Sequence, residues 1–130
     1  MTGETDLRTL LRSMDPELRY GQYVFVTVPH GQPHPPVDVL ASVHEPEGWS
    51  LVVRRDDADD LGLSYDYVAA WITLKVYSSL AAVGLTAAVS RSLADAGLSC
   101  NVIAGYHHDH LLVPFDEAER VLRILRPVAE

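Results

Sequence analysis

Residues 78–114 read SSLAAVGLTAAVSRSLADAGLSCNVIAGYHHDHLLVP, a stretch in which glycines separate segments of different periodicity. After Gly84, apolar and small residues recur at the i, i+3, i+4, i+7 spacing of an amphipathic helix. They are Leu85, Ala88, Val89, Ser92, Leu93 and Ala96. Gly97 stands where a left-handed residue commonly closes a helix. Residues 100–106 and 110–113 have the composition of strands, so the stretch predicts a helix followed by a β-hairpin.

The rest of the chain has the same kinds of segment. Strands are expected at residues 23–28, 39–43, 49–53 and 71–77, where β-branched, aromatic and apolar residues dominate. Helices are expected at 5–14, 56–61 and 116–125, from apolar spacing and acidic first turns. Residues 30–36, HGQPHPP, hold too much proline and glycine for regular structure and predict a loop.

An internal repeat relates the two halves of the chain. Residues 41–59, ASVHEPEGWSLVVRRDDAD, align with residues 104–119, AGYHHDHLLVPFDEAE, across one short gap. Within this alignment His44 matches His107, and the two apolar triplets LVV and LLV coincide. Each copy reads as strand, turn, strand and helix. The histidines at 107, 108 and 110, with Asp109, are therefore predicted to form the connection of a hairpin.

The order of elements predicts an α/β protein with a ferredoxin-like fold. The second half follows the βαββαβ plan, whereas the first half has no room for a long helix before residue 39. We expect two βαββαβ-derived halves, a degenerate one at 1–65 and a complete one at 66–130, packed as one compact unit. An antiparallel sheet would carry helices on one face.

Composition excludes several classes of function. The chain has 130 residues, a formal charge of −8 and one cysteine, Cys100. An acidic chain without a basic cluster is not expected to bind nucleic acid. The first residues lack the basic stretch and apolar run of a secretory signal, so no leader is expected. No apolar run reaches the roughly 20 residues that span a bilayer. A soluble protein of the reducing cytoplasm, with no membrane partner, is expected.

The stretch from Ser78 to Pro114 resembles an ACT domain of the aspartate-kinase regulatory type, and closely the small stand-alone bacterial ACT proteins. The features that carry the resemblance are Gly84-Leu85, Leu93, Gly97-Leu98, Asn101 and Asp109-His110 before LLVP. It is weaker before Tyr65. The resemblance implies a regulatory or sensing module that binds an amino acid or another small effector, and an enzyme or transporter that it regulates.

The stretch is also similar to the cytosolic arginine sensors, tandem-ACT proteins whose Asp-His hairpin contributes to the ligand pocket. The two resemblances together imply a set of ligand-binding residues. These are Ser79, Val83, Gly84, Leu85, Thr86, Asn101, Val102, Ile103, Tyr106, His107, His108 and Asp109.

The chemistry of these residues suits an amino acid. Backbone amides at the start of the helix after Gly84 would receive a carboxylate. Asn101 offers a donor and an acceptor, and Asp109 could pair with an ammonium group. Each residue has a simpler reading as well: Gly84 as a turn, Asn101 as the end of a strand and Asp109 as the polar tip of a hairpin.

Two other functions remain open from the sequence. His108 and His110 would share a face of an extended strand and could chelate a metal, but the chain offers no paired cysteines. An interaction module without a small ligand is the other alternative. No nucleophile elbow or phosphate loop is present, so neither an enzyme nor a cofactor is expected. Edge strands of such a sheet commonly pair across a two-fold axis, which predicts a homodimer.

Overall fold

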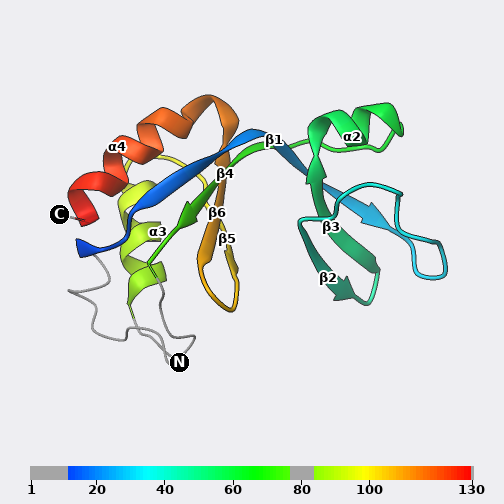
Figure 1. Ribbon diagram of the computed structural model, residues 1–130, viewed down its shortest axis with the longest axis horizontal. Coiled ribbons are helices and arrows are strands. Elements are labelled where there is room, and N and C mark those ends of the chain that lie inside the picture. Colours follow the sequence, from blue (N-terminus) through cyan, green and yellow to red (C-terminus); the bar gives the residue numbers. More distant parts are fainter. Residues whose placement is uncertain (1–11, 77–83, 130) are drawn as a thin grey trace. The chain divides into compact units, whose positions relative to one another are not determined.

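The computed structural model describes residues 12–76 and 84–129, and the helix expected over 5–14 lies almost wholly outside them (Figure 1). The described strands are β1 (Pro16–Val28), β2 (Ala41–Glu45), β3 (Gly48–Arg54), β4 (Val68–Leu74), β5 (Asn101–Ala104) and β6 (Asp109–Pro114). The helices are α2 (Arg55–Asp60), α3 (Leu85–Asp95), the 3-10 turn η1 (Phe115–Glu117) and α4 (Ala118–Ala129). The predicted α/β class and the helix after Gly84 are confirmed.

The strands form one sheet in the order β2-β3-β1-β4-β6-β5. By its internal contacts the chain divides into a central unit, residues 21–69, and a terminal unit, residues 1–20 with 70–130. The long strand β1 and the strand β4 each contribute residues to both units.

In the terminal unit, β4, α3, β5, β6 and α4 follow one another as the ferredoxin-like plan requires. The remaining strand comes from the other end of the sequence, where the first part of β1 lies beside β4. Just beyond the two strands, Lys75 N–H donates to Asp15 O at 3.3 Å and Val76 N–H to Met14 O at 3.4 Å. Local sequence patterns do not reveal that β1 lies beside β4, because the pairing joins residues about 60 positions apart.

Helices α3 and α4 cover one face of the terminal unit's strands (Figure 1). Alternate residues of β4 and β6, such as Ile72 and Leu111, point to this face and join Val89 and Leu93 of α3 in one core. The other residues of these strands, Trp71, Thr73 and His110, lie on the opposite face, where they contact one another.

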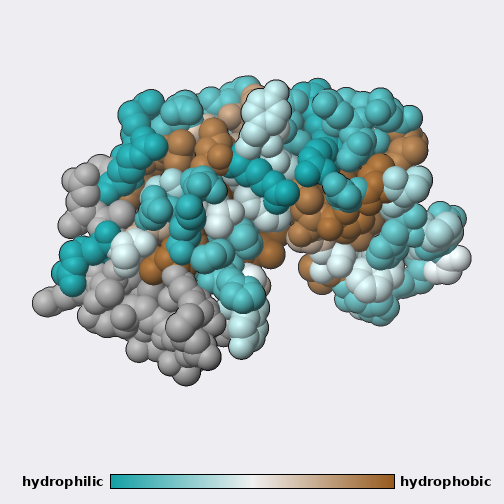
Figure 2. All heavy atoms as spheres, in the orientation of Figure 1, coloured by the Kyte–Doolittle hydropathy of each residue, from teal (hydrophilic) through white to brown (hydrophobic). Residues whose placement is uncertain are grey.

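In the central unit, β1 pairs with β3 in antiparallel register, and β3 pairs with β2. Its core consists of Val24, Val26, Val28, Leu51, Val53 and Ala58 of α2. Figure 2 shows the polar residues of α2 along the upper edge of this unit and apolar residues beneath them. As expected, no helix separates β1 from β2, because residues 29–40 form turns and irregular chain.

Candidate functional site

The hairpin tip, residues 105–108, connects β5 to β6. Gly105 N–H donates a 2.9 Å hydrogen bond to His108 O, which closes the connection. A Cβ atom on Gly105 would lie only 2.8 Å from that same oxygen. Asp109, expected within the turn, is instead the first residue of β6 and is paired with Ala104. His110, expected both in the connection and at the start of the strand over 110–113, lies in β6 and is paired with Ile103. The hydrogen bond from Gly105 closes the connection at His108, so the strand begins at the next residue.

The tip is held beside the end of β4. His108 Nδ1 lies 3.4 Å from the carbonyl oxygen of Val76, two residues beyond the end of that strand. Tyr106 is 69% exposed, and its ring stacks edge-on against His107 at a centroid distance of 5.1 Å. The hairpin tip therefore presents aromatic and imidazole groups next to the end of β4.

Asp109 is a half-buried carboxyl group at the base of the tip. Burial raises its pKa, while the positive charges available to His110 and His108 act in the opposite direction. Burial disfavours an ionised carboxylate because the protein solvates charge less well than water. A cation beside Asp109 would relieve this penalty.

His110 anchors β6 to β4 on the face of the sheet opposite the helices. Thr73 Oγ1 lies 2.9 Å from His110 Nδ1 and receives a 3.0 Å hydrogen bond from Trp71 Nε1. Because the indole can only donate, the Thr73 hydroxyl can give its proton to His110 Nδ1, which leaves the neutral ring protonated at Nε2. Burial lowers the pKa of His110, His108 and Arg19 lower it further, and Asp109 opposes them.

The start of α3 is shaped by Gly84, whose φ of 102° is in the region that favours glycine. Leu85 is buried in the core, at 3% exposure, which fixes the first turn, whereas Thr86 is exposed. No side chain caps the first amides of α3. Ser79 and Val83, also expected to contact a ligand, lie outside the described residues.

Asn101 is exposed at the start of β5 and is paired with Leu112. Three strand steps, about 10 Å, separate Asn101 from Ala104, so Asn101 lies at the end of the hairpin away from the tip. Val102 packs toward the helix-covered core, and Ile103 is paired with His110. The structure thus brings the tip to the end of β4 but does not bring Asn101 to the tip.

Sequence reasoning missed Gly105, Thr73 and Trp71, which position the hairpin. It treated His110 as a possible metal ligand and as part of the Asp109-His110 pair, but not as a partner of Thr73. The alternation in Trp71-Ile72-Thr73-Leu74 was the available signal, since it places Trp71 and Thr73 on one face of a strand. In the parts of the chain described here, no three histidine, cysteine or carboxylate side chains are grouped to hold a metal ion. Nor is any described helix long and apolar enough to cross a membrane.

Models of known protein families match both parts of this chain. An ACT domain model matches residues 2–70, and a second ACT domain model matches residues 67–127. The chain belongs to the ACT domain family. ACT domains are regulatory rather than catalytic modules, so this ACT protein is a small-molecule regulatory module with a ferredoxin-like fold. The sequence resemblance to ACT domains is confirmed.

Solved structures agree with this assignment. A Vibrio cholerae protein of unknown function, described as a possible transport protein, is 43% identical with a TM-score of 0.86. The match covers 95% of this ACT chain and 96% of that one. The regulatory subunit of aspartate kinase from Thermus flavus shares the fold at 14% identity and a TM-score of 0.65, covering 88% and 97% of the two chains. No curated protein matches the chain in sequence.

Proposed function

We propose that this ACT protein senses an amino acid, which binds at the end of the terminal unit that carries both the hairpin tip and the start of α3. Figure 1 supports the proposal, since the β5–β6 connection and the first turn of α3 lie at the same end of this unit. The observation that carries it is the fastening of the hairpin tip to the end of β4 through His108.

The groups at this end complement an amino acid. Uncapped amides at the start of an eleven-residue helix attract a carboxylate, and the left-handed Gly84 lets a ligand approach the backbone closely. Asp109 supplies a negative charge for the ammonium group, and its raised pKa indicates a carboxylate that gains from a nearby cation. Tyr106 and His107 would cover the ligand side chain.

Asn101 would complete such a site only from a second copy of the chain, because it lies at the far end of β5 from the tip. The strand β5 is the last in the sheet, so its free edge suits pairing with another copy. We therefore propose a homodimer in which the exposed Asn101 of one copy approaches the ligand of the other. The target of regulation would be an enzyme or a transporter.

A thermal-shift screen of the twenty amino acids with the full chain tests the proposal. A ligand at a hundred times its Kd should add about 2.7 kcal/mol of stability, a rise of several degrees in Tm. For the amino acid that binds, Asp109→Asn should weaken binding about tenfold, which corresponds to the loss of one charge-assisted hydrogen bond. Calorimetry measures both affinities.

Asp116→Asn is the matched control, because Asp116 is an exposed carboxylate in η1, beyond β6. It should bind like the unaltered chain. A folded protein that no amino acid stabilises would contradict the proposal. Pull-down of an enzyme or transporter in the absence of any ligand would instead favour the interaction-module alternative.

A further inference from the structure

A concave site lies within the central unit, apart from the hairpin tip. It is a pocket of about 290 Å³ at the open face of β1 and β3, beside the segment that precedes β4. Its polar and aromatic lining consists of two aromatic residues, three serine or threonine residues and one aspartate. They are Phe25, Tyr65, Thr27, Ser50, Ser64 and Asp66. Its volume is at the lower end for ligand sites, so it suits a small molecule.

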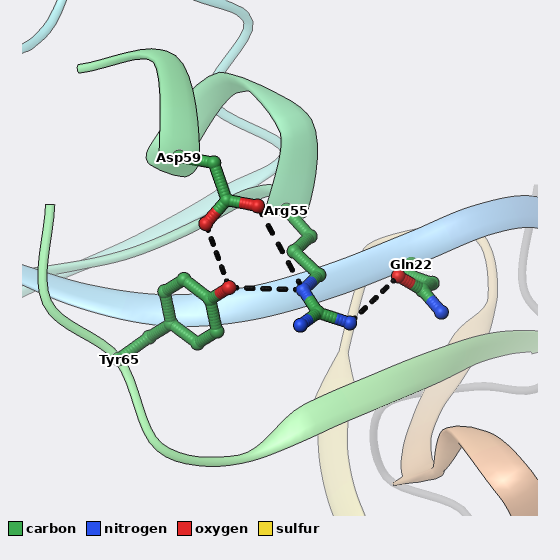
Figure 3. A network of polar contacts seen from close by, with 4 residues as sticks. All are labelled: Gln22, Arg55, Asp59 and Tyr65. Atoms are coloured by element: carbon green, nitrogen blue, oxygen red, sulfur yellow. Dashed lines mark hydrogen bonds and ion pairs between the residues drawn. The ribbon is translucent and has the colours of Figure 1, made fainter. Parts of the chain in front are cut away.

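One wall of this central-unit pocket is fixed by a network of polar contacts (Figure 3). Tyr65 donates its hydroxyl proton to Asp59 Oδ1 at 2.7 Å and accepts a 2.9 Å hydrogen bond from Arg55 Nε. Arg55 also donates to Gln22 Oε1 at 3.1 Å, which ties the network to β1. The ring of Tyr65 is therefore held in place before a ligand arrives, which limits the entropy lost on binding.

The charges around the pocket favour a cation. Asp66 is the charged residue in its lining, and the hydroxyl of Ser50, also in the lining, donates to the carboxylate of Glu45. The nearby Arg55 is balanced by Asp59, with 3.9 Å between its Nε and the carboxylate. With its proton given to Glu45, Ser50 presents oxygen lone pairs, which accept hydrogen bonds from an ammonium group.

The apolar part of the lining favours a particular kind of cation. Phe25 is 36% exposed, and with Tyr65 it offers aromatic surface for the carbon atoms of a ligand and for cation–π attraction. An inorganic ion would use the oxygen atoms but gain nothing from the rings. A carboxylate or phosphate group would meet Asp66 and be repelled.

From this lining we infer that the central unit binds a small organic amine, a primary ammonium group on a short apolar or hydroxylated body. The ammonium group lies between Asp66 and the Ser50 and Ser64 hydroxyls, and the body rests on Phe25 and Tyr65. This site needs no carboxylate on its ligand, unlike the site proposed at the hairpin tip.

An NMR titration of the full, uniformly ¹⁵N-labelled chain tests the inference with n-butylamine, n-butyrate and n-butanol, three probes of similar size and different charge. Butylamine should shift the amide resonances of residues 25–27, 50 and 64–66 and reach saturation. Butyrate and butanol should leave those resonances in place. The shifts separate the two sites, because a ligand at the hairpin tip would move residues 84–86 and 105–109 instead.

Asp66→Asn should weaken butylamine binding about fivefold, the effect of one partly solvated ion pair. Asp60→Asn, which alters an exposed carboxylate of α2 outside the lining, should leave the affinity unchanged. Phe25→Ser should also weaken binding, and its spectrum verifies that the chain is folded. Equal response to butylamine and butyrate, or an affinity that Asp66→Asn does not change, would overturn the inference.

Discussion

Gly105 is the position at which the hairpin tip tolerates no side chain. A Cβ atom there would lie 2.8 Å from His108 O and 3.1 Å from His110 Nε2. Gly105→Ala should lower the free energy of unfolding by about 1–3 kcal/mol, since a backbone oxygen must move to make room. Urea denaturation measures this loss. Ala104→Ser, at an exposed neighbouring position, should stay within about 0.5 kcal/mol of the unaltered chain.

His110 gives stability a dependence on pH. Because burial lowers its pKa in the folded state, the unfolded chain takes up the proton more readily. This contribution to stability is present in full above the ordinary histidine pKa of about 6.5 and is lost as the pH falls toward the lowered value. Acidification from pH 8 to 5 should therefore destabilise the protein, through His110 among other groups.

His110→Asn keeps an acceptor for the Thr73 hydroxyl but cannot take up a proton in this range. Urea unfolding at several pH values should show a smaller loss of stability for this variant between pH 8 and 5. Asp109 acts in the opposite sense, because burial raises its pKa and so disfavours the ionised carboxylate in the folded state. A variant with the same pH slope as the unaltered chain would refute the assigned role of His110.

Helix α2 has only six residues, too few to be stable without tertiary contacts. The hydroxyl of Tyr65 joins the side chains of Arg55 and Asp59, from the first and second turns of α2. Tyr65→Phe should speed hydrogen exchange of the α2 amides on the order of fivefold, because both contacts are lost. Mass-spectrometric exchange measures this effect. Tyr106→Phe, at a largely exposed tyrosine, should leave α2 exchange unchanged.

At the same scale, sequence patterns locate most elements but not their ends. The strand expected at 71–77 is found at Val68–Leu74. The backbone amides of Lys75 and Val76 still donate to Asp15 and Met14, but the regular strand ends at Leu74. Similarly β1 extends from Pro16 through a run of mostly polar residues, because its pairing is set by β4 rather than by local propensity.

Among residues 12–76 and 84–129, the buried apolar side chains form two separate hydrophobic cores, one in each unit. Leu93→Ala truncates a fully buried side chain of the terminal unit and should lower the free energy of unfolding by about 2–5 kcal/mol. Val24→Ala likewise truncates a fully buried side chain in the central unit and should also be destabilising. Hydrogen exchange should show early loss of protection at α3 and α4 in the first variant. In the second variant, the loss should begin at β3.

If both variants lost protection uniformly along the chain, the two cores would not be independent. Arg91→Ala is a suitable control for the helix, because Arg91 is exposed on α3 and alanine favours a helix. It should unfold at nearly the same urea concentration as the unaltered chain. The division of the sequence into halves at 1–65 and 66–130 stays a prediction.

The sequence by itself determined the class of fold and the hairpin after α3, because these depend on periodicity and turn residues close together in the chain. It also carried the resemblance to ACT domains, through the residues between Ser78 and Pro114. Only the tertiary structure decided which residues meet. It placed His108 beside Val76 and His110 beside Thr73, and it separated Asn101 from the hairpin tip. It also supplied the terminal unit's fourth strand from β1. Such contacts join residues far apart in sequence, and local patterns carry no record of a pairing that depends on the register of distant strands.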